Sequence, residues 1–276
     1  MEPDHLNWQC AGCAVEFAPA GNPPDTCPIC LDERQYIPGG VQRWTTSREL
    51  EQSGHSLEFS ELEPGLTAIR APGVGIGQSA LLVQTRRGNL LFDVPGLITD
   101  HAVEQIRALG GIATIVASHP HMYGVQVQYS QAFEDAPVYV AAADARWVQR
   151  PALSIRHWNE PFDPLPGIRL HQIGGHFPGS TVAMWSAGAN GKGVLLAGDA
   201  VFPVADGNVT FLRSYPNRIP LSGPVVRRMA AQLSALDFAR LYNNFATSVP
   251  SRAGQVVQFS ALRYAQWAEG VHDDLT

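Results

Sequence analysis

The sequence predicts a mixed α/β protein that begins with a small metal-binding module. All four cysteines fall within the first thirty residues, as two Cys-x-x-Cys pairs. Further along the chain, short apolar runs typical of strands alternate with amphipathic segments typical of helices. Two histidines, His119 and His121, directly follow one of these apolar runs. We therefore expect a module over residues 1–42, a linker with a short helix over 43–56, and a large α/β domain over 57–276.

Composition excludes several classes of function. The chain has 276 residues, of which 45% are apolar, so it can bury a sizeable core. A net charge of −6 argues against nucleic-acid binding, which depends on Lys and Arg against phosphate. No stretch approaches the roughly 20 apolar residues of a membrane span, and Met1-Glu2-Pro3-Asp4 is acidic and lacks an apolar signal region. We expect a cytoplasmic protein that binds a small-molecule substrate, with no nucleic-acid or membrane partner.

The cysteine pairs predict a four-thiolate metal site. Cys10-x-x-Cys13 and Cys27-x-x-Cys30 have the spacing of a tetrahedral site for Zn²⁺, with iron as the alternative. Two disulfides are disfavoured in a cytoplasmic chain, and redox-active pairs usually open a helix in a βαβ unit. With Trp8 before the first pair, the segment resembles a zinc ribbon or rubredoxin. We expect the module to add stability and no chemistry, so that its loss leaves other metal sites loaded.

Charge makes the module a poor partner for nucleic acid. Residues 1–42 contain six acidic side chains and one basic side chain, Arg34, whereas a phosphate-binding surface needs the opposite balance. We interpret Asp32, Glu33, Arg34 and their neighbours as a solvated surface. The six are Glu2, Asp4, Glu16, Asp25, Asp32 and Glu33. The module is expected to dock either on its own chain or on a partner.

The large domain shows a regular order of strands and helices. Strands are predicted at 66–70, 79–85, 89–93, 112–117, 138–141, 168–173, 181–185, 194–196, 209–212 and 238–242. Helices are predicted at 100–109, 125–133, 143–149, 224–236 and 254–269. A proline-rich loop is predicted over 151–166.

The two histidines suit chelation of a metal ion. His119 and His121 lie just past the carboxyl end of the strand at 112–117. Because they are two residues apart, we expect both imidazoles to project in the same direction from the end of this rigid strand. Neutral ring nitrogens of this kind are common metal ligands. The alternative from this pair alone is two polar loop histidines.

Four segments together resemble the metallo-β-lactamase superfamily. They are Leu90-Leu91-Phe92-Asp93, Ser118-His119-Pro120-His121, Gly174-Gly175-His176-Phe177-Pro178-Gly179-Ser180 and Leu195-Leu196-Ala197-Gly198-Asp199, in the family's order. The resemblance covers residues 57–276 and implies a four-layer αββα sandwich with metal at one edge of the two sheets. It also implies that His119, His121, His176 and Asp199 are the metal ligands, and that Asp93 orients the loop that carries the first two.

The chain departs from the family at the second metal. The family motif is His-x-His-x-Asp-His, and here Tyr123 and Gly124 replace its Asp and third His. A last family histidine is also missing, because residues 241–245 contain none. Three imidazoles and one carboxylate suffice for one metal ion, so we expect a mononuclear centre with Zn²⁺, or alternatively Fe²⁺.

The predicted activity is metal-dependent hydrolysis of an ester, thioester or amide. Zinc held by histidines lowers the pKa of bound water to about 7. Asp199 is expected to complete the coordination or to orient and deprotonate that water. Tyr123, whose phenol stands in a ligand position of the family motif, is expected to hydrogen-bond the substrate or the water.

A polar loop further along supplies candidate substrate-binding residues. Tyr215, Asn217 and Arg218 offer groups that can grip an anion or a carbonyl. The alternative is a rigid turn fixed by Pro216 and Pro220.

Two other functions compete with hydrolysis. His119 or His121 with His176 and Asp199 forms the two-histidine, one-carboxylate set of a mononuclear iron oxygenase or redox enzyme. Alternatively, the metal site is degenerate and the protein is a scaffold whose cysteine module mediates assembly. Metal identity separates the three, since zinc favours hydrolysis, iron favours redox chemistry and an empty site favours a scaffold.

Overall fold

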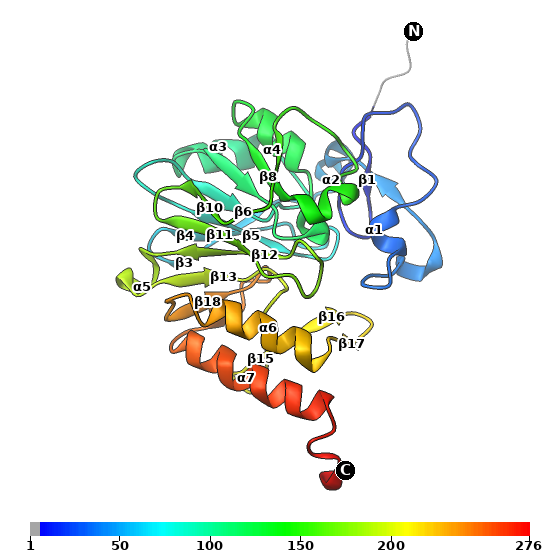
Figure 1. Cartoon of the computed structure of the whole chain (residues 1–276). Helices are drawn as coiled ribbons and strands as arrows, with labels where there is room; N and C mark the ends of the chain where they lie inside the picture. Colours follow the sequence, from blue (N-terminus) through cyan, green and yellow to red (C-terminus); the bar gives the residue numbers. More distant parts are fainter. Residues whose placement is uncertain (1–5) are drawn as a thin grey trace. The chain divides into compact units, whose positions relative to one another are not determined.

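A computed structural model describes residues 6–276, which divide into two compact units at the boundary between Trp158 and Asn159. Residues 1–5 are outside the described part, so the Met1–Asp4 segment and the start of the predicted module are not included. Figure 1 follows the chain through both units.

The first unit is built on a seven-stranded sheet. Its strand order is β3-β4-β5-β6-β7-β8-β9, antiparallel from β3 to β6 and parallel from β6 to β9. The strands are β3 (Glu58–Glu63), β4 (Leu66–Arg70), β5 (Ser79–Val83), β6 (Leu90–Phe92), β7 (Thr114–Val116), β8 (Val138–Ala141) and β9 (Ile155–Trp158). The central strands β5, β6 and β7 are buried throughout, which matches the continuous apolar runs in their sequences.

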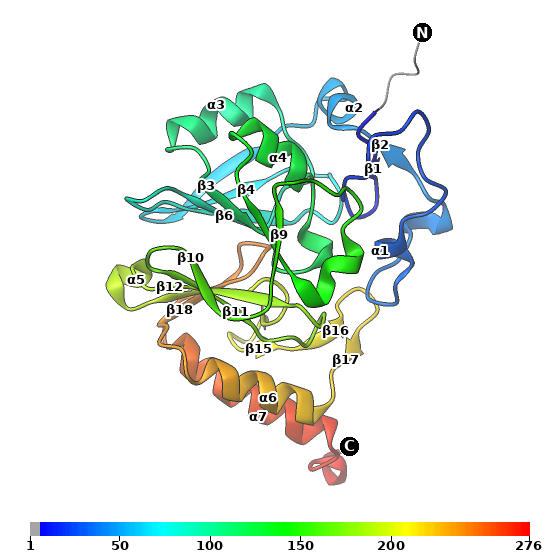
Figure 2. The ribbon, with the colours of Figure 1, turned by 45° about the horizontal axis from the view of Figure 1, so that its top comes forward.

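Helices connect the parallel strands of this sheet. Helix α3 (Asp100–Ala108) lies between β6 and β7, and α4 (Gln126–Ala132) lies between β7 and β8. Both cover the same face of the sheet (Figures 1 and 2). Thr99 caps α3, its hydroxyl accepting a hydrogen bond from the backbone N–H of Ala102 at 3.1 Å. Short 3-10 turns, Pro120–Met122 and Ala142–Trp147, follow β7 and β8 and bring polar side chains to the ends of those strands.

The cysteine module belongs to the same unit. Its strand β1 (Gln9–Cys10) pairs with β2 (Trp44–Thr45), so part of the predicted linker is hydrogen-bonded into the module. The remaining pieces are α1 (Pro28–Leu31), a 3-10 turn over Pro38–Gly40 and α2 (Ser47–Gln52). Because Ala18 N–H donates to the carbonyl of Gln149 at 3.1 Å, the module docks on its own chain.

The second unit contains a six-stranded sheet of order β10-β11-β12-β13-β18-β19. These strands are β10 (Phe162–Leu165), β11 (Ile168–Gln172), β12 (Thr181–Trp185), β13 (Val194–Leu196), β18 (Arg240–Tyr242) and β19 (Ser248–Val249). Only β13 and β18 pair in parallel. A one-turn α5 (Gly188–Gly191) connects β12 and β13.

Two long helices and two small hairpins complete this unit. Helix α6 (Gly223–Leu233) and helix α7 (Ala253–Ala268) lie side by side (Figures 1 and 2). The hairpins are β14 (Phe202–Pro203) with β15 (Val209–Thr210), and β16 (Leu212–Ser214) with β17 (Ile219–Pro220). The helices share an apolar core with the sheet that includes Leu195, Leu241, Met229 and Val257. A final 3-10 turn covers Asp273–Leu275.

Most predicted elements are confirmed, with three corrections. The strand predicted at 209–212 is divided between β15 and β16, which belong to separate hairpins. The strands predicted at 138–141, 181–185 and 194–196 have those bounds in the structure. The loop predicted over 151–166 is wrong, because it contains β9 and β10. Each is the last strand of its own sheet, and an edge strand tolerates the prolines that suggested a loop. The helix predicted at 143–149 is a 3-10 helix over Ala142–Trp147.

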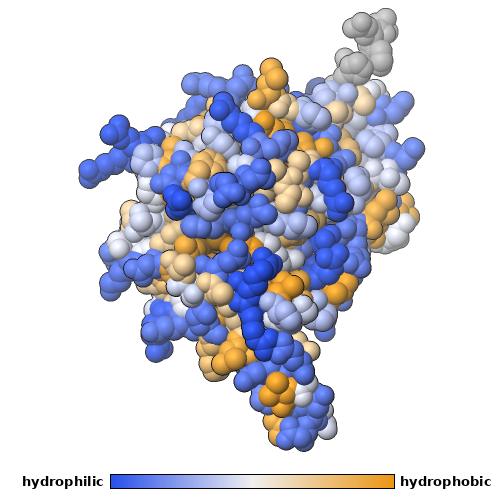
Figure 3. Space-filling model, viewed as in Figure 1, coloured by the Kyte–Doolittle hydropathy of each residue, from blue (hydrophilic) through white to orange (hydrophobic). Residues whose placement is uncertain are grey.

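Each unit therefore supplies one large sheet and its helices, which confirms the predicted mixed α/β fold. The stacking of these layers as αββα, and the domain boundaries at residues 42 and 56, stay predictions. Among residues 6–276, no helix is long and apolar enough to cross a membrane. Figure 3 shows hydrophilic side chains over most of the face in view, with scattered apolar patches between them.

Candidate metal centres

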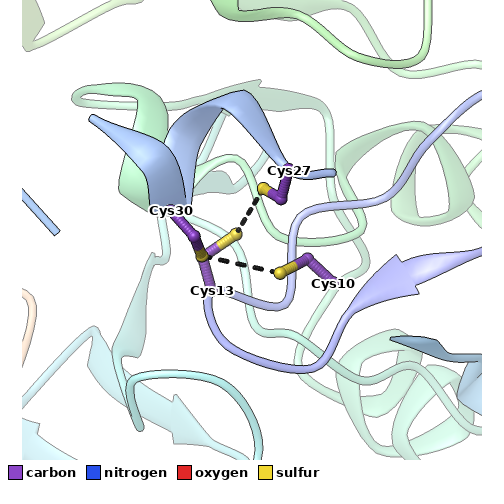
Figure 4. A group of neighbouring side chains, drawn as sticks. All are labelled: Cys10, Cys13, Cys27 and Cys30. Atoms are coloured by element: carbon purple, nitrogen blue, oxygen red, sulfur yellow. Dashed lines mark hydrogen bonds between the residues drawn. The ribbon is translucent and has the colours of Figure 1, made fainter. Parts of the chain in front are cut away.

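The four cysteines form a compact buried cluster. Cys10 ends β1 and Cys13 lies in the turn after it, while Cys27 precedes α1 and Cys30 lies within that helix, with all four sulfurs pointing inward (Figure 4). The sulfur atoms of Cys10 and Cys30 are 3.5 Å apart, and those of Cys13 and Cys27 are 3.7 Å apart. All four sulfurs lie within 4.8 Å of one another.

These distances suit a metal ion and exclude disulfides. A disulfide joins sulfurs about 2.05 Å apart, whereas four bonds of about 2.3 Å to one Zn²⁺ hold them about 3.8 Å apart. Hydrogen bonds with the other thiols, Cys13 first, lower the pKa of Cys10, while those shared with Cys10 raise the pKa values of Cys13 and Cys30. The cluster thus resists carrying four negative charges unless a cation compensates them, and it fits a metal ion.

In the first unit, the loop after β7 presents two buried histidines. The rings of His119 and His121 lie 5.3 Å apart at an angle of 76°. Ser118 Oγ lies 2.9 Å from His119 Nδ1, which leaves Nε2 as the atom placed to bind a metal. Asp93 Oδ1 accepts a hydrogen bond from the backbone N–H of Ser118 at 2.7 Å. This contact supports the interpretation of Asp93 as the residue that orients the loop.

Gly124 and Tyr123, which replace the third His and the Asp of the His-x-His-x-Asp-His motif, have structural roles in this loop. Gly124 has a φ of +47°, and a Cβ there would lie 2.5 Å from the carbonyl oxygen of Val94 and 2.6 Å from that of Pro95. The Tyr123 hydroxyl donates to the backbone carbonyl of Asp144 at 3.1 Å. Burial raises the pKa of Tyr123 well above its usual value. The role of Tyr123 in catalysis stays a prediction, and a substrate would have to compete with the Asp144 carbonyl.

Gly124→Ala should destabilise the protein by roughly 2–4 kcal/mol, because the added methyl group meets two carbonyl oxygens and the backbone is left-handed. Chemical denaturation measures the change. Gly207→Ala is the matched control, since Gly207 has a φ of +80° with open space around it. The control should cost about 1 kcal/mol, the conformational part alone. Equal losses in the two variants would show that the loop has room for a side chain at position 124.

In the second unit, His176 lies in a tight glycine-rich turn between β11 and β12. Gly174 and Gly175 have φ angles of +67° and +91°, and a Cβ on Gly175 would lie 2.5 Å from the sulfur of Met229. The turn is closed by Ser180, whose Oγ accepts from the backbone N–H of Phe177 at 2.8 Å. His176 Nδ1 lies 3.2 Å from the carbonyl of Leu212, so Nε2 is again the atom placed to bind a metal.

Asp199 lies beside His176 in the same unit. It follows β13 and Gly198, and its carboxylate Oδ2 is 4.0 Å from His176 Nε2. That separation is too long for a hydrogen bond, and it lies within the span of about 4.2 Å that two bonds of about 2.1 Å to one ion can bridge. The hydroxyl of Tyr215 donates to the backbone carbonyl of Asp199 at 2.9 Å, and its ring lies 5.7 Å from that of His176. Tyr215 thus supports the position of both residues.

The remaining predicted substrate residues lie on the exposed turn after β16. Asn217 N–H donates to Ser214 Oγ at 3.1 Å, and Arg218 has a left-handed φ of +55°. Both side chains are exposed. The contacts of Tyr215 and Asn217 agree with the alternative of a rigid turn, and substrate binding by these residues stays a prediction.

The segment that replaces the last family histidine is a turn as well. Asn243 Oδ1 accepts hydrogen bonds from the N–H of Phe245 and from the N–H and hydroxyl of Thr247, all at 2.9 to 3.0 Å. Asn243 therefore has a turn-forming task, which agrees with the expectation of one metal ion at the histidines.

Two charged residues of the module are buried. Arg34, interpreted with Asp32 and Glu33 as part of a solvated surface, is 5% exposed and pairs with Asp32 at 2.7 Å. Glu16, for which the sequence predicted no role, is 2% exposed and pairs with Arg150 at 2.6 Å. Burial raises its pKa even though Arg150 opposes the rise. Its position between Val15 and Phe17, both apolar, was the only local sign of burial.

Comparison with solved structures defines the class of fold. The chain is similar to VMB-1, with 18% identity, a TM-score of 0.58, and coverage of 76% of this chain and 98% of that one. It is similar to the DIM-1 metallo-β-lactamase, with 13% identity, a TM-score of 0.56, and coverage of 75% and 98%. A B3 metallo-β-lactamase with an active-site glutamic acid gives 16% identity, a TM-score of 0.53, and coverage of 84% and 97%. The chain has the metallo-β-lactamase fold.

Comparison with known protein sequences shows the family of the chain. No protein-family profile matches the sequence. The uncharacterized protein YmaE of Bacillus subtilis (strain 168) is 42% identical over 259 residues, which span 92% of this chain and 94% of the relative. The chain belongs to the family of YmaE.

Proposed function

We propose that His119, His121, His176 and Asp199 bind one Zn²⁺ and that the protein is a metal-dependent hydrolase of a small-molecule ester, thioester or amide. The observation that carries this proposal is the character of the four side chains. All four are buried, and each offers one ligand atom. The metallo-β-lactamase fold, whose solved neighbours include hydrolases named for β-lactams, supports the reaction class.

The donor set suits zinc. Three imidazoles and a carboxylate are ordinary ligands of this ion, and contacts to Ser118 and Leu212 direct the Nε2 atoms of two histidines toward ligation. When bound, Zn²⁺ lowers the pKa of its water to about 7 and polarises a carbonyl oxygen. Fe²⁺ is the alternative ion and would favour redox chemistry instead.

Asp199 has the larger catalytic role in this proposal. Its carboxylate binds the metal or orients the attacking water and takes its proton, while Tyr215 holds its backbone in place. Tyr123 contributes at most one hydrogen bond to substrate. Tyr215, Asn217 and Arg218 would border the substrate on the side of the exposed turn.

The site is proposed to be mononuclear. Gly124 has no ligand atom and no space for one, and Asn243 is engaged in a turn. Asp199 alone does not hold a second dication, because stable zinc sites need three or more protein ligands.

Hydrolysis should depend on Asp199 much more than on Tyr123. Asp199→Asn removes a charged ligand or base and should lower kcat/KM by about 10²–10⁴-fold. Tyr123→Phe removes one hydrogen bond worth about 0.5–1.5 kcal/mol, so the loss should stay near tenfold or less. A broad screen of ester and thioester substrates measures both variants against the wild-type protein. Equal losses would count against these roles.

A further inference from the structure

We propose that Glu16 is a positioning residue for the histidine loop, and that metal binding at the four cysteines fixes this loop through it. The inference rests on the proposed function only where it concerns metal affinity at the histidines. Sequence alone predicts a module whose loss leaves that site loaded. The contacts within the first unit point to coupling instead.

Glu16 joins the module to the segment that follows the two histidines. Its backbone N–H donates to the carbonyl of Gly124 at 3.0 Å. Its carboxylate accepts hydrogen bonds from the backbone N–H of Val127 and from Gln128 Nε2 at 3.3 Å. It also pairs with Arg150 at 2.6 Å. One buried residue thus holds the end of the histidine loop through its backbone and the start of α4 through its side chain.

The link from this carboxylate to the cysteine cluster is short and rigid. Glu16 stands three residues after Cys13, and the intervening Ala14 and Val15 are buried. Ala14 has a left-handed φ of +62° and packs against Val74 and Leu97. With a metal ion on Cys13, this stretch has little freedom, because its ligand and its packed side chains fix it at several points.

A second contact joins the module to residues 94–96, which also hold the histidine loop. Gln9, next to Cys10, donates from its Nε2 to the carbonyl of Gly96 at 2.9 Å. Residues 94–96 in turn hold the histidine loop, since Val94 N–H donates to the carbonyl of Met122 at 3.1 Å. Two residues beside the first cysteine pair therefore reach the second half of the histidine loop, Glu16 directly and Gln9 through residues 94–96.

Loss of the Glu16 side chain should loosen the histidine loop locally, whereas loss of an ordinary stabilising residue lowers the stability of the whole protein. Without the carboxylate, the N–H of Val127 and the guanidinium of Arg150 lose their acceptor, and residues 119–127 gain freedom. A metal site that must order its own ligands binds more weakly than a preorganised one. The loss should therefore appear as local opening of the loop and as weaker metal binding at the histidines.

The test uses the full-length protein and four variants, of which three keep the metal on the cysteines and the fourth, Cys27→Ser, loses it. Glu16→Ala removes all acceptor atoms, and Glu16→Gln keeps one for Val127 and serves if the first variant does not fold. Asp25→Asn is the control, because it removes one carboxylate from an exposed position of the same module. Hydrogen exchange of residues 119–128 and competition of a chelator for the histidine-site metal are measured, with exchange in β12 as the check on global stability.

We expect Glu16→Ala to speed exchange in residues 119–128 and to weaken metal binding at the histidines, each by about tenfold or more, with β12 unchanged. Glu16→Gln should lie between this variant and the wild type, and Asp25→Asn should match the wild type. Cys27→Ser should show the same faster exchange as Glu16→Ala.

Two results would overturn the inference. One is unchanged exchange in residues 119–128 in both Glu16 variants. The other is faster exchange with unaltered metal affinity at the histidines. A third result would separate the two proposals. If the wild-type protein binds no metal at the histidines, and the Glu16 variants still show faster exchange in residues 119–128, Glu16 positions the loop but the proposed function is contradicted.

Discussion

His119→Ala should lower the metal content of the purified protein from about two ions per chain to about one, and should abolish hydrolysis. The expected loss in kcat is about 10³-fold or more, since a metal-activated nucleophile disappears with the ion. The cysteine cluster lies on other elements and keeps its metal. Elemental analysis of the protein, with zinc and iron quantified together, measures the content.

The control for this variant is His101→Ala. His101 is an exposed residue of α3 and belongs to neither metal centre. It should retain wild-type metal content and activity. A His119→Ala protein with unchanged metal content would show that the ion is held without this imidazole, and the ligand set would have to be revised.

Cys27→Ser should unfold the module, because structural zinc in a thiolate site supplies on the order of 10 kcal/mol of apparent folding energy at neutral pH. Much of that energy is lost when one of four thiolates is missing. We expect faster proteolysis within residues 6–42 and the loss of one ion per chain. Limited proteolysis followed by mass spectrometry measures the first change.

The matched control is Thr26→Ala, an exposed neighbour of Cys27. It should retain both the ion and the resistance to protease. Resistance of Cys27→Ser equal to that of the wild type would show that packing alone stabilises the module. A folded Cys27→Ser protein that has lost turnover, although residues 119–128 exchange as in the wild type, would favour an electron-relay role for the cluster.

Much of the fold could be predicted because its signals are local. Buried strands such as β8 and β12 are continuous apolar runs, and α3 begins at a threonine cap. The strands β9 and β10 were missed because a proline within β10 and others flanking the two strands suggested a loop, and only the pairing of each strand with its sheet explains them. Pairing of this kind is decided by distant residues.

The candidate sites likewise could be predicted where their signal is local and could not where it depends on distant residues. The spacing of Cys10 and Cys13 with Cys27 and Cys30 sufficed to predict their cluster, since the geometry of one ion sets that spacing. The task of Glu16 could not be predicted. Its partners Gly124, Val127 and Arg150 are more than one hundred residues away along the chain, and an acidic residue is ordinarily exposed.

The measurement that tests the central claim most directly is the location and number of metal ions in crystals of the wild-type protein, from anomalous scattering at the zinc and iron edges. We predict one ion among the four cysteines and one zinc ion bound by His119, His121, His176 and Asp199. Two adjacent ions beside His119 and Asp199 would contradict the mononuclear centre. A histidine site that holds no metal after growth with ample zinc would contradict the proposed hydrolase.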